Sequence, residues 1–326
     1  MPAATPSGAA FWKHASYDEN RYMSRLSSLS RSRSALRFEV PARSLSAAGL
    51  SAEDRWLRLP NGGHYHYVAA GDPSKPLLVF FHGLADSWRS VAPLIPYLAS
   101  DFHILALDQR GHGETGDHFD SYAPADFAAD AAAFIAVLGR WPTVLIGHCM
   151  GSIVAQRIAA ARPWVAKQLV LIGATDSAAE NPALKELAGA ILQLPDPPPV
   201  SFVRGFRAKI ARSLPQAGHK DAFVADSVKL TKRVWQETVC GLLVDRQTVA
   251  EQIRMPTLVV WGESDGLFGA STQARLRAVL PRASFVSYAE SGHAPHWERP
   301  ELLSNSILSF LAANANARTA RAHASR

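Results

Sequence analysis

One pentapeptide constrains this chain of 326 residues more than any other feature, because it sets a cysteine between two glycines where a strand meets a helix. Gly147-His148-Cys149-Met150-Gly151 follows the apolar run 144–146 and precedes the helix-like run 152–155. Flanking glycines let two backbones pass closely, and a sharp turn of this kind lifts its central side chain clear of the sheet. The start of a helix also favours negative charge there. The pattern therefore predicts a nucleophilic thiol at Cys149.

Short apolar runs alternate with helical periodicity from about residue 55 onwards. Six runs are predicted to be strands, at residues 77–81, 103–107, 143–146, 168–172, 257–261 and 284–286. Four segments are predicted to be helices, at residues 126–138, 151–161, 271–280 and 300–311. Ahead of them, Asn61-Gly62-Gly63 between two alternating runs predicts a hairpin. This order indicates an α/β fold with a mainly parallel sheet covered by helices on both faces.

The alternation breaks between about residues 176 and 245, where the chain is helix-like and four prolines cluster at 195–199. We predict that this segment is a helical cap over the carboxyl edge of the sheet, where open α/β sheets place their active sites. The remaining boundaries follow from it. We predict a core at residues 51–175 and 246–312, a basic N-terminal extension at 1–50 and a basic C-terminal tail at 313–326.

The positive charge is confined to the two ends of the chain. Residues 1–44 carry a net charge of +4 and residues 313–326 a net charge of +3, which leaves −1 for residues 45–312 out of a total of +6. Because nucleic-acid-binding proteins concentrate basic charge on a folded face, we predict no nucleic-acid partner. No uninterrupted apolar stretch reaches about 18 residues, so we predict no transmembrane segment.

Two further features bear on the compartment. Two cysteines are too few for a disulfide scaffold, and Cys240, in an apolar run, is interpreted as a small buried hydrophobe. The N-terminus lacks the pattern of a secretory signal. Its Ser/Arg-rich residues 24–34 have the composition of an organellar transit peptide or of a plain extension. We favour the extension and a cytoplasmic location, with organellar targeting left open.

Four further segments match one family in order: Phe81-His82-Gly83-Leu84, Asp108-Gln109-Arg110-Gly111-His112-Gly113, Val259-Val260-Trp261-Gly262-Glu263-Ser264-Asp265 and Ser291-Gly292-His293-Ala294. With the pentapeptide, they make residues 55–312 resemble the α/β-hydrolase family. The resemblance implies a catalytic triad of Cys149, Asp265 and His293, in the family's own order. It also implies an oxyanion hole formed by the backbone N–H groups of Leu84 and Met150.

The cysteine departs from the family's usual serine and leaves the reaction open. The resemblance implies a small-molecule acyl substrate, no cofactor, and hydrolysis of a carboxylic ester or lactone through a Cys149 acyl-enzyme. Alternatives are an acyltransferase or cyclase with the same triad, a serine-type esterase with an engineered Ser-to-Cys change, an inactive site, a non-catalytic ligand binder and a lyase. Epoxide opening and halide displacement on this fold resemble reactions that use Asp at the central position of the turn, so Cys149 argues against both. The oligomeric state is not predicted by the sequence.

Several other patterns receive plainer interpretations. The glycines of residues 111–116 are interpreted as a structural turn, because a loop and not a helix follows them. The pairs His293/His296 and His64/His66 lack companion ligands at metal spacing, so no metal is predicted. Within the pentapeptide, His148 is interpreted as a packing residue.

The sequence leaves three groups of residues to be placed by the structure. Glu263 and Asp176 are rivals to Asp265 as the triad acid. Candidate walls of the substrate pocket are Trp88, Trp235, Leu267 and Phe268. Basic residues of the cap are interpreted as a solvated face, namely Arg204, Arg207 and Lys209.

Overall fold

The computed structural model describes residues 43–47, 50–141, 143–211, 213 and 217–324. The chain divides into two compact units, residues 1–37 and 38–326, and every described residue belongs to the second. Most of the predicted N-terminal extension therefore lies outside the described residues. Within it, residues 43–47 and residue 50 belong to strands.

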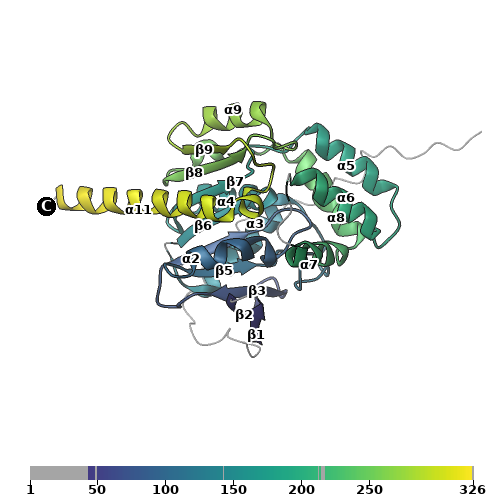
Figure 1. Cartoon of the computed structure of the whole chain (residues 1–326), viewed down its shortest axis with the longest axis horizontal. Coiled ribbons are helices and arrows are strands. Elements are labelled where there is room, and N and C mark those ends of the chain that lie inside the picture. Colours follow the sequence, from purple (N-terminus) through teal and green to yellow (C-terminus); the bar gives the residue numbers. More distant parts are fainter. Residues whose placement is uncertain (1–42, 48–49, 142, 212, 214–216, 325–326) are drawn as a thin grey trace, which may run out of the picture. The chain divides into compact units, whose positions relative to one another are not determined.

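One sheet organises the described residues, and it contains nine strands in the order β1-β2-β3-β5-β4-β6-β7-β8-β9 (Figure 1). Their bounds are β1 Arg43–Ala47, β2 Leu50–Arg58, β3 His64–Ala70, β4 Leu77–Phe81, β5 His103–Leu107, β6 Thr143–His148, β7 Ala166–Ile172, β8 Thr257–Gly262 and β9 Ser284–Tyr288. The neighbouring pairs β1–β2, β2–β3 and β3–β5 are antiparallel. The other five pairs, β5–β4, β4–β6, β6–β7, β7–β8 and β8–β9, are parallel. The predicted mainly parallel α/β sheet is confirmed.

Helices cover both faces of this sheet, and the alternation of strand side chains explains why. In β4, Val79 and Phe81 belong to one core cluster, and Leu78 and Phe80 to the other. The first cluster is completed by α3 (Pro124–Leu138), α4 (Met150–Ala161) and α9 (Ala270–Val279), and the second by η1 (Trp88–Leu94), α2 (Ile95–Leu98) and α11 (Pro300–Ala324). A strand buried on both faces must be apolar throughout, as these runs are.

Four helices fill the segment predicted as a cap: α5 Pro182–Leu192, α6 Val200–Ile210, α7 Ala217–Val228 and α8 Lys232–Val244. Figure 1 shows them grouped together beside the sheet. Side-chain caps fix two of their starts, since Asn181 accepts a hydrogen bond from the N–H of Leu184 and Thr231 accepts one from Val234. The exact boundaries of the cap remain a prediction.

Two short helices and the long last helix complete the described residues. The remaining helices are η2 Ala250–Gln252 and α10 Pro295–Glu298. The last helix, α11, runs to Ala324, so most of the segment predicted as a C-terminal tail is helical, while residues 325–326 lie outside the described residues. Its Ala-rich sequence favours that extension.

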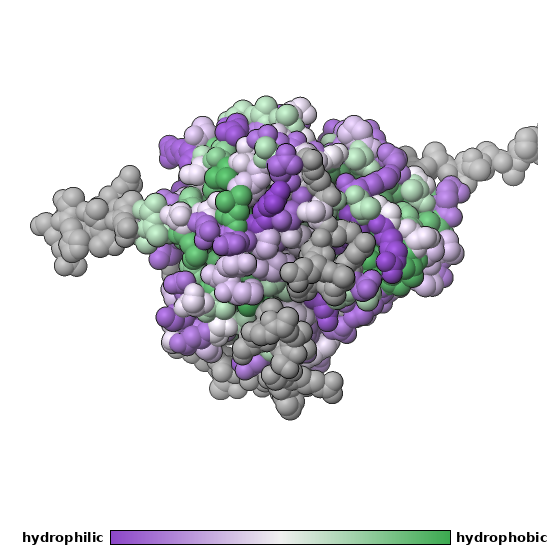
Figure 2. Space-filling view, in the orientation of Figure 1, coloured by the Kyte–Doolittle hydropathy of each residue, from purple (hydrophilic) through white to green (hydrophobic). Residues whose placement is uncertain are grey.

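The surface of the described part mixes residue types. Figure 2 shows hydrophilic residues interspersed with scattered hydrophobic ones on the face in view. Large hydrophobics that are exposed include Leu192, Val200 and Leu302. Among the described helices, none has the length and apolar character needed to cross a membrane.

Candidate active site

Cys149 occupies a strained turn between β6 and α4. Its φ of +51° lies in the left-handed region that non-glycine residues rarely adopt. The turn is possible because a Cβ on Gly147 would stand 2.2 Å from the carbonyl oxygen of Gly151, and a Cβ on Gly151 would stand 2.1 Å from that of Phe81. Two glycines therefore permit the close backbone approach that projects the thiol from the end of the strand at the start of a helix.

His293 and Asp265 are brought together by the loops that follow β9 and β8. The Nδ1–H of His293 donates to Oδ2 of Asp265 at 2.8 Å, and both side chains are buried. Oδ1 of Asp265 accepts from the N–H groups of Leu267 and Phe268 at 2.8 and 2.9 Å. This carboxylate is thus fully engaged, and it fixes the tautomer of the histidine.

The electrostatics of this pair follow from burial opposed by charge. Burial alone would lower the pKa of His293, but the carboxylate of Asp265 and the nearby Cys149 raise it well above the usual range. Burial would raise the pKa of Asp265, and the charge and hydrogen bond of His293, with two backbone N–H groups, lower it. The site therefore favours a positively charged imidazole beside the carboxylate of Asp265.

The two rival acids lie elsewhere. Glu263 accepts a hydrogen bond from the hydroxyl of Ser287 at 2.7 Å, and both residues are exposed. Asp176 pairs with Arg275 at 3.3 Å. Neither carboxylate contacts His293, so Asp265 is the partner that the fold selects.

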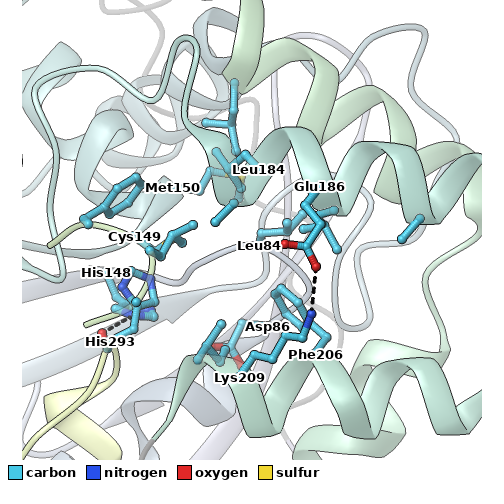
Figure 3. A pocket seen from close by; sticks show the side chains of 18 of the residues that line it. Leu84, Asp86, His148, Cys149, Met150, Leu184, Glu186, Phe206, Lys209 and His293 are labelled. Atoms are coloured by element: carbon cyan, nitrogen blue, oxygen red, sulfur yellow. Dashed lines mark hydrogen bonds and ion pairs between the residues drawn. The ribbon is translucent and has the colours of Figure 1, made fainter. Parts of the chain in front are cut away.

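A cavity of about 540 Å³ opens in front of Cys149 and His293 (Figure 3). Leu84 and Met150, the predicted oxyanion donors, also line it. As the first residue of α4, Met150 has an N–H with no partner in a preceding helical turn. The arrangement can present backbone donors to an oxygen bound beside the sulfur.

Apolar side chains from the cap and the core form most of the cavity wall. Those that sequence reasoning missed are Ile153, Leu184, Leu187, Phe202, Phe206, Ile210 and Leu242. The helical spacing of these residues, in the cap and in α4, resembles that of ordinary core residues, so no local signal distinguished them.

Of the four expected wall residues, Leu267 and Phe268 line the cavity and the two tryptophans do not. Trp88 starts η1 and packs in the second core cluster on the other face of the sheet. Trp235 is fully buried behind Phe202 and Phe206, with ring centroids 5.4 and 5.1 Å away. The expectation for Trp88 and Trp235 is therefore corrected, because both rings are used for packing.

The three basic residues of the cap differ in their exposure to solvent. Arg204 and Lys209 are exposed and pair with Asp221 and Glu186. Arg207 is buried instead, which corrects the expectation of a solvated face for this residue. Its guanidinium donates to the carbonyl of Ala85 at 2.7 Å and pairs with Asp86 at 3.2 Å.

A buried polar cluster lies at one side of the cavity. Asp86 and His148 line the cavity, and His296 lies behind them. One ligand-type atom of each lies within 4.8 Å of the others, so His296 does have the companions that its sequence neighbourhood lacks. His148 packs against the rings of His293 and His296, as expected of a packing residue, but it also reaches the cavity.

The loop after β5 is a structural turn, as its sequence predicts. The carboxylate of Asp108 accepts from the N–H groups of Trp88 and Glu114 and pairs with His66. A Cβ on Gly113 would stand 2.1 Å from that carboxylate. Arg110 forms two hydrogen bonds with Asp130, at 2.6 and 2.8 Å, and so holds the loop on α3.

Residues 78–305 match the sequence pattern of the alpha/beta hydrolase family. The chain is 27% identical over 247 residues to a 2-(acetamidomethylene)succinate hydrolase from Mesorhizobium japonicum, covering 73% of this chain and 88% of the relative. It is 26% identical over 315 residues to human epoxide hydrolase 4, covering 84% of each chain.

A solved structure shares the fold. A putative aryl esterase from Burkholderia cenocepacia superimposes with a TM-score of 0.71 at 23% sequence identity, covering 81% of this chain and 99% of the esterase. At this identity the similarity bears on the fold. The reactions named for these proteins differ, so the chemistry must be argued from the residues of the site.

Proposed function

The chain belongs to the alpha/beta hydrolase family and is an enzyme of that family, and on this premise we propose that it hydrolyses carboxylic esters or lactones through a Cys149 acyl-enzyme. The observation that carries the proposal is the position of Cys149. Its thiol stands at a strained turn, at the start of α4, in the same cavity as the buried His293–Asp265 pair. Nucleophile, base and orienting acid are thus supplied by three separate loops.

The proposed reaction has two halves. In the first, the sulfur of Cys149 attacks the carbonyl carbon, a C–S bond forms, and the alkoxide leaves with a proton from His293. In the second, water attacks the thioester and gives its proton to His293, the C–S bond breaks, and the free acid leaves. Asp265 stabilises the imidazolium that is present before the leaving group takes the proton and that forms again when water gives its proton to His293. The backbone N–H groups of Leu84 and Met150 would bind the oxyanion in both halves.

The cavity argues for an apolar acyl group. Its volume of about 540 Å³ falls in the range of roughly 300–1,000 Å³ that small-molecule sites occupy. Apart from residues near the nucleophile, the charged residues that line it include Glu186 and Lys209, which pair with each other at 3.1 Å. Figure 3 shows this pair across the cavity from Cys149 and His293. A hydrophobic chain would therefore contact carbon over most of its length.

The test is intact-protein mass spectrometry after mixing with p-nitrophenyl butyrate, with p-nitrophenol followed in parallel. We expect the wild-type chain to gain one butyryl mass and Cys149→Ala to gain none while it stays folded. Cys149→Ser distinguishes a cysteine mechanism from a serine mechanism, because serine has nearly the same shape as cysteine and preserves the turn. If the wild type gains no mass and releases no product while Cys149→Ser turns over briskly, the cysteine mechanism is wrong and the fold carries a serine esterase.

A further inference from the structure

The polar cluster beside the nucleophile has hydrogen-bonding capacity that no protein group uses. Nδ1 of His148 and Nδ1 of His296 are buried and have no hydrogen-bond partner among the described residues. Asp86 is 1% exposed and His148 is 2% exposed, yet both line the cavity. Buried polar atoms as a rule form hydrogen bonds. Where no protein group supplies the partner, an ordered ligand or water molecule does.

The hydrogen bond that His148 does make fixes its free nitrogen as an acceptor. Nε2 of His148 lies 3.1 Å from the carbonyl oxygen of His293, which can only accept, so Nε2 carries the proton. Nδ1 is then unprotonated, and its lone pair can accept a hydrogen bond. This atom lies beside the nucleophile, because a Cβ on Gly83 would stand 3.0 Å from His148 Nδ1 and 3.1 Å from Cys149 Cβ.

Charge decides what such a cluster holds, because its spacing suits more than one kind of ligand. Three groups that each sit about 2.8 Å from a shared tetrahedral oxygen stand about 4.6 Å from one another, whereas ligands about 2.1 Å from zinc stand about 3.4 Å apart. The observed limit of 4.8 Å accommodates both arrangements, so the charge of the cluster must distinguish them. Arg207 already neutralises Asp86 at 3.2 Å, so the cluster has no net negative charge for a cation. A neutral molecule that donates hydrogen bonds suits it best.

We propose that Asp86 and His148, backed by His296, hold the water molecule that hydrolyses the Cys149 thioester. This inference rests on the proposed acyl-enzyme. Water presents two O–H groups, of which one donates to His148 Nδ1 or to the Asp86 carboxylate. The other transfers its proton to His293 as the C–O bond forms and the C–S bond breaks. The site thereby lowers the entropy cost of bringing water to the carbonyl.

The cluster also distinguishes water from simple alcohols. A monohydric alcohol has one O–H group, and that proton must go to His293 when the alcohol attacks. Nothing remains to donate to Asp86 or His148, so the cluster gives such an alcohol no advantage. The proposal therefore makes this pair the determinant that favours hydrolysis over acyl transfer.

The experiment measures how the butyryl-enzyme divides between water and methanol, from the ratio of butyric acid to methyl butyrate. Wild type is compared with Asp86→Asn and His148→Phe. We expect at least a tenfold fall in the hydrolysis rate, methanolysis within about threefold of wild type, and acylation within about threefold. Asp176→Asn is the matched control, since it makes the same carboxylate-to-amide change away from the cavity, and its product ratio should equal that of wild type.

Each outcome decides the inference. A purely structural role would slow hydrolysis and methanolysis equally and leave the product ratio unchanged, and that result would overturn the proposal. Asp86→Asn keeps the shape of the side chain and an oxygen for Arg207, so it decides the matter if His148→Phe does not fold. If wild type acquires no acyl mass at all, the proposed function has failed. If it does acquire the mass and the ratio is unmoved, the water site alone has failed.

Discussion

The carboxylate of Asp265 accepts a hydrogen bond from Nδ1 of His293 at 2.8 Å, with both side chains buried from solvent. The two residues are 28 positions apart and come from different loops at the carboxyl edge of the sheet. Gly173, after β7, makes the pairing possible, because a Cβ there would stand 3.1 Å from the imidazole ring. Sheet topology, and no local motif, sets this distance.

Replacing Asp265 with asparagine should cut kcat/KM for p-nitrophenyl butyrate by at least about a hundredfold, since comparable triad changes cost up to about 10⁴. The amide can still accept from Leu267 and Phe268, so the loop should stay folded, while His293 loses the charge that raises its pKa. Asp176→Asn is the control and should stay within threefold of wild type. An equal loss of kcat/KM in both variants would show that Asp265 is not the acid of the triad.

A second prediction concerns the turn at Cys149. Gly151→Ala should lower the free energy of unfolding by about 3 kcal/mol, at the upper end of overpacking costs, because the new Cβ would stand 2.1 Å from the Phe81 carbonyl oxygen. Gly189→Ala in α5 has nothing within 4 Å of its Cβ and should raise stability by about 0.5–1 kcal/mol. Urea denaturation measures both. A neutral Gly151→Ala would contradict the close-packed turn.

The sheet and the turn at Cys149 could be read from sequence because both depend on local signals. Buried parallel strands must be apolar, and the turn at Cys149 needs its glycines, so each leaves a pattern within a few residues. The strands β4 to β9 accordingly lie where the apolar runs predict. The early part of β2 is mostly polar, with Glu53, Asp54 and Arg55 in succession, and gave no such run.

The cavity could not be read in the same way. Phe202 and Phe206 in α6 have the spacing of core residues, yet they line the cavity, with Trp235 packed behind them. The Asp86–His148–His296 cluster joins three segments that are far apart in sequence. Arg207, a cap residue with the sequence context of a surface cation, is buried because Ala85, Ser227 and Asp86 supply its acceptors.

The shape of the cavity predicts a chain-length preference. Each methylene that is buried contributes about 0.8 kcal/mol, or about fourfold in kcat/KM, until the cavity is filled. Leu187→Trp narrows the cavity and should reduce kcat/KM for p-nitrophenyl octanoate at least tenfold, with the acetate within twofold. Leu192→Trp makes the same change on α5 at an exposed position off the cavity, and should spare both substrates. Equal loss of the two esters in Leu187→Trp would argue against this acyl site.

Acid should destabilise the fold before its carboxylates titrate. Burial lowers the pKa of five described histidines, namely His82, His103, His112, His148 and His296. For His112 the pKa falls to about 3, chiefly by burial. Because the unfolded chain binds a proton at about 6.5 and the folded chain resists it, stability is complete above that pH and is lost between about 6.5 and 3. His66 and His293, with raised pKa, oppose this trend.

His112→Asn isolates one of these contributions. Nδ1 of His112 donates to the carbonyl of Arg110 at 2.7 Å, and an asparagine amide can replace that bond without a titratable ring. Relative to pH 7.5, the variant should lose about 2 kcal/mol less stability at pH 5 than wild type, since each unit below 6.5 costs about 1.4 kcal/mol. Phe127→Leu removes a ring that packs on His112 and should destabilise equally at both pH values. If His112→Asn and wild type lose the same amount on acidification, His112 is not held neutral by the fold.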